Sequence, residues 1–347
     1  MIIREKSFSR VSSCASCLLA RPAVRGSVFC AAAYDAILNG LQDWQTTISL
    51  PVILDVDRLY EIYIMVLMDV PALFHVSNAA SFKIGTSCTV RPEYIMTPGD
   101  YRKHFAKVEQ FLQNCKKKVG SYPLFNQLQL IHDAVILHVR YHDTDTHNEH
   151  NVLGTIVDRK AVCESLAKSY KLICDYMTIP CAVVFGYSDE DNESVQNTTF
   201  SITEGRPEDN HAWNKVLLGG VWYNVDLTFD VTLGAFEERI ILRYDYFLRS
   251  DRFFSHHYPS QQRYLPDCNT DYQLYQRLDL TVRTEKDLQR ILKDAKSKDV
   301  VFEVDPACGW TPSQIRDKVM QACFLLGKSP KSSNHNPVTN IYCVVFH

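Results

Sequence analysis

The sequence has no apolar stretch long enough to span a membrane. A membrane helix needs about 18 or more apolar residues in a row, and the most apolar segment, Ile62 to Leu67 with its flanks, is short and is interrupted by aspartate and proline. The 347-residue chain also lacks an excess of charge, because its formal net charge is −3. Such a balance argues against a nucleic-acid-binding protein. We therefore expect neither a membrane span nor a nucleic-acid partner.

The chain also lacks a clear set of ligands for a metal ion. Cys14 and Cys17 have the spacing of a redox or zinc pair, but no second pair of ligands follows nearby. The polar loop 142–151 contains histidine and aspartate, yet no two of them fall on a predicted regular element at ligand spacing. We therefore expect no bound metal and no organic cofactor.

The 12 cysteines are scattered and do not form the pattern of a disulfide framework. Several lie inside apolar stretches, which suits reduced thiols in a reducing compartment. The first thirty residues are basic and rich in serine, and their apolar patch Cys17–Ala20 is shorter than the about 7–15 residues of a secretory signal. We therefore expect a disordered tail over 1–30 and a cytoplasmic location, with export as the less favoured alternative.

The sequence does contain a thiol placed at the start of a helix. Residues 163–177 carry apolar residues at three- and four-residue steps, which predicts a helix with one buried stripe. Cys163 lies in the first turn, where unpaired N–H groups and the positive end of the helix dipole favour a thiolate over a thiol. Taken alone, a cysteine on such a stripe is more often a small core residue.

A histidine and an aspartate are placed by a predicted hairpin. Gly219-Gly220 indicates a two-residue turn between strands over 211–218 and 221–228. In that register His211 is diagonal to Asp226, within reach of a side-chain hydrogen bond. The alternation puts both on the face directed away from the core. Each alone is typical of the surface, but the hairpin predicts contact between the two.

Four stretches of sequence surround these three residues. They are Gly154-Thr155-Ile156-Val157 with Lys160-Ala161-Val162-Cys163-Glu164-Ser165-Leu166-Ala167-Lys168, Met177-Thr178-Ile179-Pro180-Cys181, His211-Ala212-Trp213-Asn214, and Trp222-Tyr223-Asn224-Val225-Asp226-Leu227-Thr228-Phe229-Asp230. Together they resemble the transglutaminase-like superfamily, and more closely its bacterial members, which are often described as cysteine proteases. The resemblance covers residues 120–265 most strongly.

The resemblance implies an α+β fold with a papain-like core. It implies that Cys163 at a helix N-terminus is the nucleophile, that His211 is general base and then acid, and that Asp226 is the orienting carboxylate, with His211 and Asp226 on adjacent antiparallel strands. The chain departs from the family at Ser165-Leu166, where glycine and an aromatic residue are common, and at Thr178, where glycine is usual. The first difference affects packing beside the nucleophile and the second a helix C-cap, but neither removes a catalytic group.

Patterns on both sides of the core 121–270 predict small flanking modules. An N-terminal α+β module is expected over 31–120, with helices at 31–40, 56–70 and 99–118 and strands at 50–54, 74–76 and 81–90. A C-terminal α/β module is expected over 280–347, with strands at 280–283, 300–304 and 341–346, helices at 285–295 and 312–326, and a polar break at 328–337. The acidic segment 188–210 runs into His211, and we hypothesise that it favours cationic substrates; a solvated loop is the alternative.

These features predict a cysteine-dependent acyl-transfer enzyme that acts on peptide or side-chain amides of a protein or peptide substrate through a thioester. Water would resolve the thioester in a peptidase or amidase, and an amine would resolve it in a transglutaminase. The three residues do not choose between these outcomes. We favour hydrolysis, because the bacterial relatives are so described and nothing in the sequence indicates a lysine tunnel. A non-catalytic binding or scaffold module is the other alternative.

Overall fold

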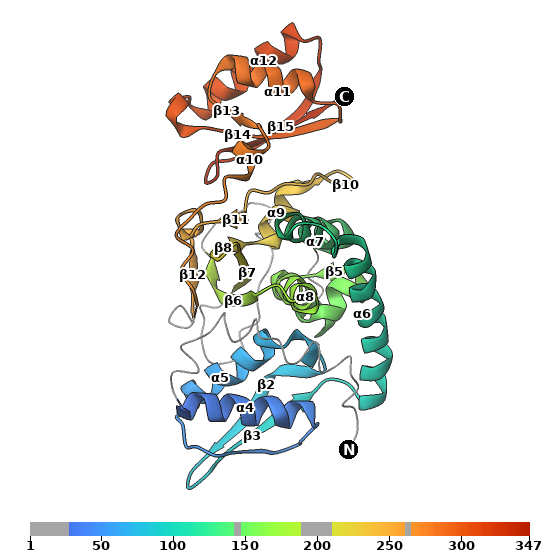
Figure 1. Ribbon diagram of the computed structural model, residues 1–347, viewed down its shortest axis with the longest axis vertical. Helices are drawn as coiled ribbons and strands as arrows, with labels where there is room; N and C mark the ends of the chain where they lie inside the picture. The colour runs from blue at the N-terminus through green and yellow to red at the C-terminus, as the bar shows by residue number, and fades with distance from the viewer. Residues whose placement is uncertain (1–27, 142–146, 189–209, 261–264) are drawn as a thin grey trace.

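The computed structural model describes residues 28–141, 147–188, 210–260 and 265–347. It is a mixed fold of helices and sheets, with a five-stranded sheet and helix α8 in the middle and two smaller parts at opposite ends of the longest axis (Figure 1). Within these residues, no helix combines the length and apolar character that a membrane crossing requires. The ten described cysteines are all free, and nine of them are buried, which agrees with the expectation of reduced core thiols.

The N-terminal part packs two helices on a three-stranded antiparallel sheet of order β1-β3-β2. Its elements are α4 (Val28–Gln42), β1 (Ile48–Leu50), α5 (Val56–Asp69), the short helix η1 (Pro71–Leu73), β2 (Val76–Ile84) and β3 (Cys88–Tyr94). Helix α4 begins inside the expected tail 1–30, so that boundary was wrong; the rest of the expected tail lies outside the described residues. The predicted strand 81–90 is also wrong, because the chain turns at Gly85 and β2 pairs with β3 as a hairpin.

Two helices connect this part to the central sheet. Helix α6 (Pro98–Val119) begins at Thr97, whose hydroxyl accepts a hydrogen bond from the Asp100 N–H at 3.2 Å. Three lysines in its last turn face the negative end of the helix dipole. Figure 1 shows α6 running along one side of the molecule. Helix α7 (Leu124–His138) follows and packs against α8.

The central sheet has the order β11-β8-β7-β6-β12, and every pair in it is antiparallel. Helix α8 packs on β6 and β7. Gly219-Gly220 joins β7 to β8 with Leu218 opposite Val221, so the predicted hairpin register is confirmed. The elements of this region are β4 (Arg140–Tyr141), η2 (His147–His150), η3 (Gly154–Asp158), β5 (Lys160–Ala161), α8 (Cys163–Tyr176), β6 (Cys181–Ser188), β7 (His211–Leu218), β8 (Val221–Val225), α9 (Leu227–Gly234), β9 (Ala235–Phe236), β10 (Arg239–Ile240), β11 (Phe247–Arg249), η4 (Asp251–Phe254) and β12 (His257–Pro259).

The second face of the β7–β8 hairpin, which was expected to point away from the core, is buried. Trp213, Lys215 and Asn224 on this face are each 1% exposed. The Lys215 ammonium donates hydrogen bonds to Asp251 Oδ1 at 3.1 Å and to Pro266 O at 2.8 Å. The side chains that cover this face are Phe229, Tyr246, Phe254 and Leu265, and Ala182 and Val184 of β6 lie beside the hairpin on the same face of the sheet. Alternation along one hairpin cannot show that the following chain folds back over its polar face.

The predicted strand 221–228 is three residues too long. Strand β8 ends at Val225, and Asp226 is the N-cap of α9. Aspartate is favoured at this position because its side chain accepts hydrogen bonds from the free N–H groups of the first turn. Asp226 therefore lies between a strand and a helix, which corrects the expectation that His211 and Asp226 both lie within adjacent strands.

The C-terminal part is a four-stranded sheet of order β13-β14-β16-β15 with two helices packed on it. Both helices begin with a capping box, Thr284 with Asp287 and Thr311 with Gln314. The predicted polar break 328–337 is wrong, because β15 lies within it; its polar residues suit the exposed edge strand that they form. The elements are α10 (Leu274–Arg277), β13 (Thr281–Val282), α11 (Glu285–Asp294), β14 (Asp299–Val304), η6 (Pro306–Cys308), α12 (Pro312–Leu325), β15 (Pro330–Asn336) and β16 (Ile341–Phe346).

Replacing Gly186 by alanine should destabilise the central sheet. Gly186 lies opposite His211 on one side and Pro259 on the other, and an added Cβ would lie 2.2 Å from the Tyr258 carbonyl oxygen. Because that neighbour is backbone, β12 must move, and we expect a loss of about 1–3 kcal/mol in the free energy of unfolding. Urea unfolding measures it. The control is Gly85→Ala, where an added Cβ meets nothing within 4 Å; equal stability of the two variants would contradict the prediction.

Candidate active site

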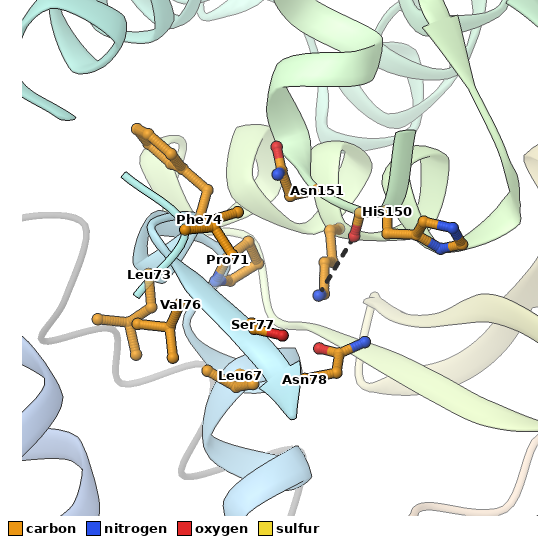
Figure 2. A pocket seen from close by; sticks show the side chains of 11 residues that line it. Leu67, Pro71, Leu73, Phe74, Val76, Ser77, Asn78, His150 and Asn151 are labelled. Carbon is orange, nitrogen blue, oxygen red and sulfur yellow. Dashed lines mark hydrogen bonds between the residues drawn. The ribbon is translucent and has the colours of Figure 1, made fainter. Parts of the chain in front are cut away.

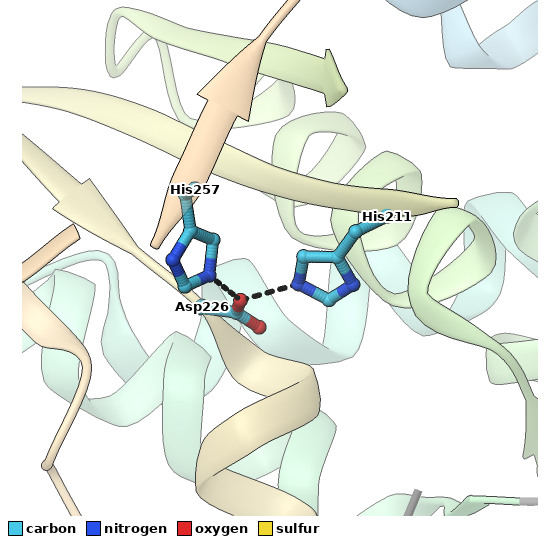
Figure 3. Close-up of side chains that lie close together, drawn as sticks. All are labelled: His211, Asp226 and His257. Carbon is cyan, nitrogen blue, oxygen red and sulfur yellow. Dashed lines mark hydrogen bonds and ion pairs between the residues drawn. The ribbon is translucent and has the colours of Figure 1, made fainter. Parts of the chain in front are cut away.

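Asp226 lies at the centre of a buried hydrogen-bond network that joins β7, α9 and β12. Its side chain is 0% exposed. Its Oδ1 accepts hydrogen bonds from the backbone N–H groups of Thr228 and Phe229 at 2.9 and 3.2 Å. Its Oδ2 accepts a hydrogen bond from His211 Nε2 at 2.6 Å (Figure 3). The contact between His211 and Asp226 that the hairpin predicts is therefore present.

Cys163 lies on the other side of His211. It is the first residue of α8 and is 3% exposed, and it lies close enough to the His211 imidazole to raise the pKa of that ring together with Asp226. Because Nε2 of His211 donates to Asp226, Nδ1 is the ring nitrogen that remains for Cys163. The structure thus brings together a thiol, an imidazole and a carboxylate from α8, β7 and the start of α9.

The charges of His211 and Asp226 support each other. Burial alone would lower the pKa of His211, but the charge and hydrogen bond of Asp226, followed by the interactions with Cys163, outweigh it and raise that pKa well above 6.5. Burial alone would raise the pKa of Asp226, but His211 and then His257 hold that pKa far below its ordinary range. An imidazolium–carboxylate pair is therefore favoured at neutral pH.

His257 is a second imidazole on the same carboxylate, and the sequence analysis missed it. It comes from β12, is 5% exposed, and donates from Nε2 to Asp226 Oδ2 at 3.1 Å (Figure 3). Its Nδ1 is buried without a hydrogen-bond partner among the described residues. Burial lowers the pKa of His257 more than Asp226 raises it, so the ring is neutral. The only signal in the sequence is a histidine pair, 256–257, whose second member begins a strand too short to show alternation.

Aromatic rings enclose the two imidazoles. The His211 ring centroid lies 5.0 Å from that of Phe229 and 5.9 Å from that of Trp213. The His257 ring centroid lies 4.5 Å from that of Phe254. These rings keep water from Asp226, so its hydrogen bonds act at a lower effective dielectric constant than they would in water.

The first turn of α8 holds a second buried charge next to Cys163. Glu164 Oε1 accepts hydrogen bonds from Lys168 Nζ at 2.6 Å and from Asn78 Nδ2 at 2.9 Å, and its Oε2 lies 3.3 Å from His150 Nδ1. Burial would raise the pKa of Glu164, but Lys168, His150 and Asn78 together lower it to about 2. This cluster ties the start of α8 to the N-terminal part through Asn78 of β2.

The two departures from the family pattern have clear structural roles. Ser165 is buried, donates from Oγ to Asn151 O at 2.5 Å and accepts from the Thr155 N–H at 3.1 Å, so it fixes α8 to the segment before it. Thr178 follows the C-cap of α8 with a φ of 62°. That left-handed conformation is the one that glycine adopts most readily.

Among the described residues, His211, Asp226 and His257 are the group whose ligand atoms could hold a metal, because one such atom from each lies within 4.8 Å of the others. These residue types suit a transition-metal ion. However, each Nε2 already donates a hydrogen bond to Asp226 Oδ2. Both Nε2 atoms and the two oxygens of Asp226 therefore have hydrogen-bond partners without an ion, whereas Nδ1 of His257 has none among the described residues. In the loop 142–151, residues 142–146 lie outside the described residues, as do residues 189–209 of the acidic segment.

Comparison with known proteins identifies the central part of the chain. Residues 109–227 match the model of the transglutaminase-like superfamily. This segment is transglutaminase-like. It contains Cys163, His211 and Asp226 and ends one residue after Asp226, so His257 lies outside the transglutaminase-like segment.

Two solved structures are similar to the chain. One is a "putative cysteine protease" from Cytophaga hutchinsonii, 20% identical, with 41% of this chain and 51% of that chain covered and a TM-score of 0.28. The other is named as a TGase, 12% identical, with 57% and 53% covered and a TM-score of 0.30. The likeness spans about half the length of each, and scores of this size do not establish a shared overall fold. No curated protein matches the sequence significantly.

We expect Asp226→Asn to lower the pKa of His211. Asparagine can still cap α9 but carries no charge, so burial then prevails and the pKa falls below its ordinary value of about 6.5. NMR titration of the His211 ring, with both proteins in a Cys163→Ala background, isolates the effect of the carboxylate. Because the folded-state pKa of His211 is raised, its stabilising effect is present below about pH 6.5 and lost as pH rises through the folded-state pKa. The same His211 titration in both proteins would contradict this account.

Proposed function

We propose that this protein is a cysteine-dependent acyl-transfer enzyme that hydrolyses peptide or side-chain amides through a thioester. Cys163 is the nucleophile, His211 is the general base and then the general acid, and Asp226 orients the imidazole. The observation that supports this most directly is that Cys163 lies beside the His211 imidazole, which is hydrogen-bonded to a carboxylate whose Oδ1 is fixed by the first turn of α9.

At the start of the first half of the reaction, the proton of the Cys163 thiol is already on His211 Nδ1, as a thiolate–imidazolium pair, and the thiolate sulfur attacks the amide carbonyl carbon. A C–S bond forms, and the carbonyl electron pair moves to oxygen. As the first residue of α8, Cys163 has a backbone N–H with no partner within the helix, and this N–H stabilises the oxyanion. The C–N bond then breaks, and the amine leaves with the proton from His211.

In the second half, His211 takes a proton from water, and the resulting hydroxide oxygen attacks the thioester carbon. The C–S bond breaks and the acid product leaves, while the proton taken from water stays on His211, so the thiolate–imidazolium pair is restored. An amine in place of water would give transfer instead of hydrolysis. Asp226 carries its negative charge throughout, because its pKa is held far below neutral pH, so it stabilises the imidazolium at each stage.

The neutral His257 acts as a positioning residue. Its Nε2–H and that of His211 share Oδ2 of Asp226, while Oδ1 is held by α9. With three elements fixing the carboxylate, the plane of the His211 ring is set before substrate binds, which is the preorganisation that proton transfer requires.

Replacing Cys163 by alanine should abolish turnover. We expect the hydrolysis rate in a peptide-library digest to fall by roughly 10³-fold or more. The control is Cys174→Ala, which removes a buried thiol from the same helix. The digest is run with and without a primary amine. Products that contain the amine would show that the acyl group is transferred to amines and not to water. An unchanged rate in Cys163→Ala would favour the scaffold alternative.

Replacing His257 should affect turnover and leave substrate binding intact. In His257→Leu, the loss of a hydrogen bond to a charged group, about 1.5–3 kcal/mol, should lower kcat by about 10- to 100-fold with KM within about twofold. His257→Gln keeps an N–H donor and should recover most of kcat. If kcat falls equally in both variants, or if KM rises in step, the positioning role is wrong.

A further inference from the structure

A cavity of about 180 Å³ lies between the N-terminal part and the start of α8. One wall is apolar and comes from the end of α5, η1 and the start of β2, with Leu67, Leu73, Phe74 and Val76 lining it (Figure 2). The opposite wall is polar and includes Lys168 of α8 and His150 of η2. Binding sites for drug-sized ligands measure about 300–1,000 Å³, so this cavity suits a single side chain.

The polar wall offers a hydrogen-bond donor without offering net charge. Lys168 is 7% exposed, and its ammonium donates to Glu164 Oε1 at 2.6 Å and more weakly to His150 O at 3.4 Å. An ammonium group has three N–H donors, and no further partner for the third occurs among the described residues. Because Glu164 balances the charge of Lys168, the wall favours a neutral acceptor such as a peptide carbonyl over an anion.

The cavity lies beside the first two turns of the helix that begins at Cys163. Glu164 follows Cys163 and is hydrogen-bonded to Asn78, which lines the cavity. Lys168 lies five residues beyond Cys163, which in a helix is a rise of about 7.5 Å and a rotation of about 140°. Across a helix about 10–12 Å wide, this rotation adds about 10 Å to the separation, so the two positions lie about 13 Å apart. An extended peptide covers about 3.3–3.6 Å per residue, so a substrate held at Cys163 reaches the cavity within about four residues.

From these observations we infer that the cavity is a substrate subsite that takes the apolar side chain of a peptide residue near the reacting carbonyl. The side chain packs on the wall of Leu73, Phe74 and Val76, and the peptide carbonyl beside it accepts a hydrogen bond from Lys168 Nζ. The placement of this residue near Cys163 rests on the proposed function. The prediction that the cavity binds apolar peptides can be tested without any reaction.

Binding to the full-length Cys163→Ala protein separates recognition from chemistry. Acetylated pentapeptide amides that differ only in a central leucine, phenylalanine, aspartate or glycine are titrated by calorimetry. We expect leucine and phenylalanine peptides to bind at least about tenfold more tightly than the glycine peptide. Equal binding of all four peptides, or no binding, would overturn the inference.

A variant that fills the cavity tests whether the preference for apolar peptides arises there. Ser77 of β2 lines the cavity, so Ser77→Phe should remove the preference for leucine over glycine. Ser81→Phe places the same ring on an exposed position of the same strand and should preserve the preference. Thermal unfolding checks that both variants are folded. If Ser77→Phe is unfolded, Ser77→Leu replaces it. A preference that survives filling would show that the peptides bind elsewhere.

The role of Lys168 is tested by Glu164→Gln together with Lys168→Met, which removes the donor without leaving an unpaired buried charge. All peptides should bind about 3- to 10-fold more weakly, with the leucine preference kept; unchanged affinity would exclude the carbonyl contact.

The proposed subsite and the proposed enzyme activity can fail independently of each other. Apolar preference in Cys163→Ala together with an inactive native protein would leave the subsite standing and reject the enzyme.

Discussion

The structure around the site depends on the hydrogen bonds of one buried carboxylate. Asp226 accepts four of them, two from the first turn of α9 and one each from His211 and His257. A buried charge is costly unless it is fully paired, so the elements that supply these donors are held in a fixed arrangement. The same constraint that ends β8 and starts α9 therefore aligns the imidazole next to Cys163. Removing the whole side chain would loosen the helix start and the histidine together.

The start of α8 depends on a second buried charge of the same kind. Glu164 is paired with Lys168 within the helix and with Asn78 from β2, so the N-terminal part is attached to the site through hydrogen bonds as well as apolar packing. Cys163 thus lies between two satisfied carboxylates, one on each side of the helix start. The N-terminal part contributes a wall of the nearby cavity, and its position relative to Cys163 is fixed by Asn78.

The sequence predicted the elements whose signals are local. The apolar steps of 163–177 and the Gly219-Gly220 turn were sufficient for α8 and for the register that joins His211 to Asp226. Structural features that depend on packing between distant parts of the chain were missed. Alternation could not distinguish a strand residue from a helix cap at position 226, and β15 is polar because it is an edge strand. His257 comes from a three-residue strand, whose place beside β6 is set by the close approach of Gly186 to Tyr258.

Because the site depends on distant packing, it needs more of the chain than the segment that contains Cys163, His211 and Asp226. The transglutaminase-like match ends at residue 227, yet three of the four donors to Asp226 (Thr228, Phe229 and His257) lie beyond it, and one partner of Glu164 comes from β2. Aromatic cover over the site also comes from Phe254, beyond the match. A segment limited to 109–227 would retain the thiol, imidazole and carboxylate but would expose Asp226 to water and leave Glu164 with fewer partners. The thiol, imidazole and carboxylate belong to the matched segment, while part of the burial that shifts the pKa values of Glu164, His211 and Asp226 is supplied by the chain on both sides of it.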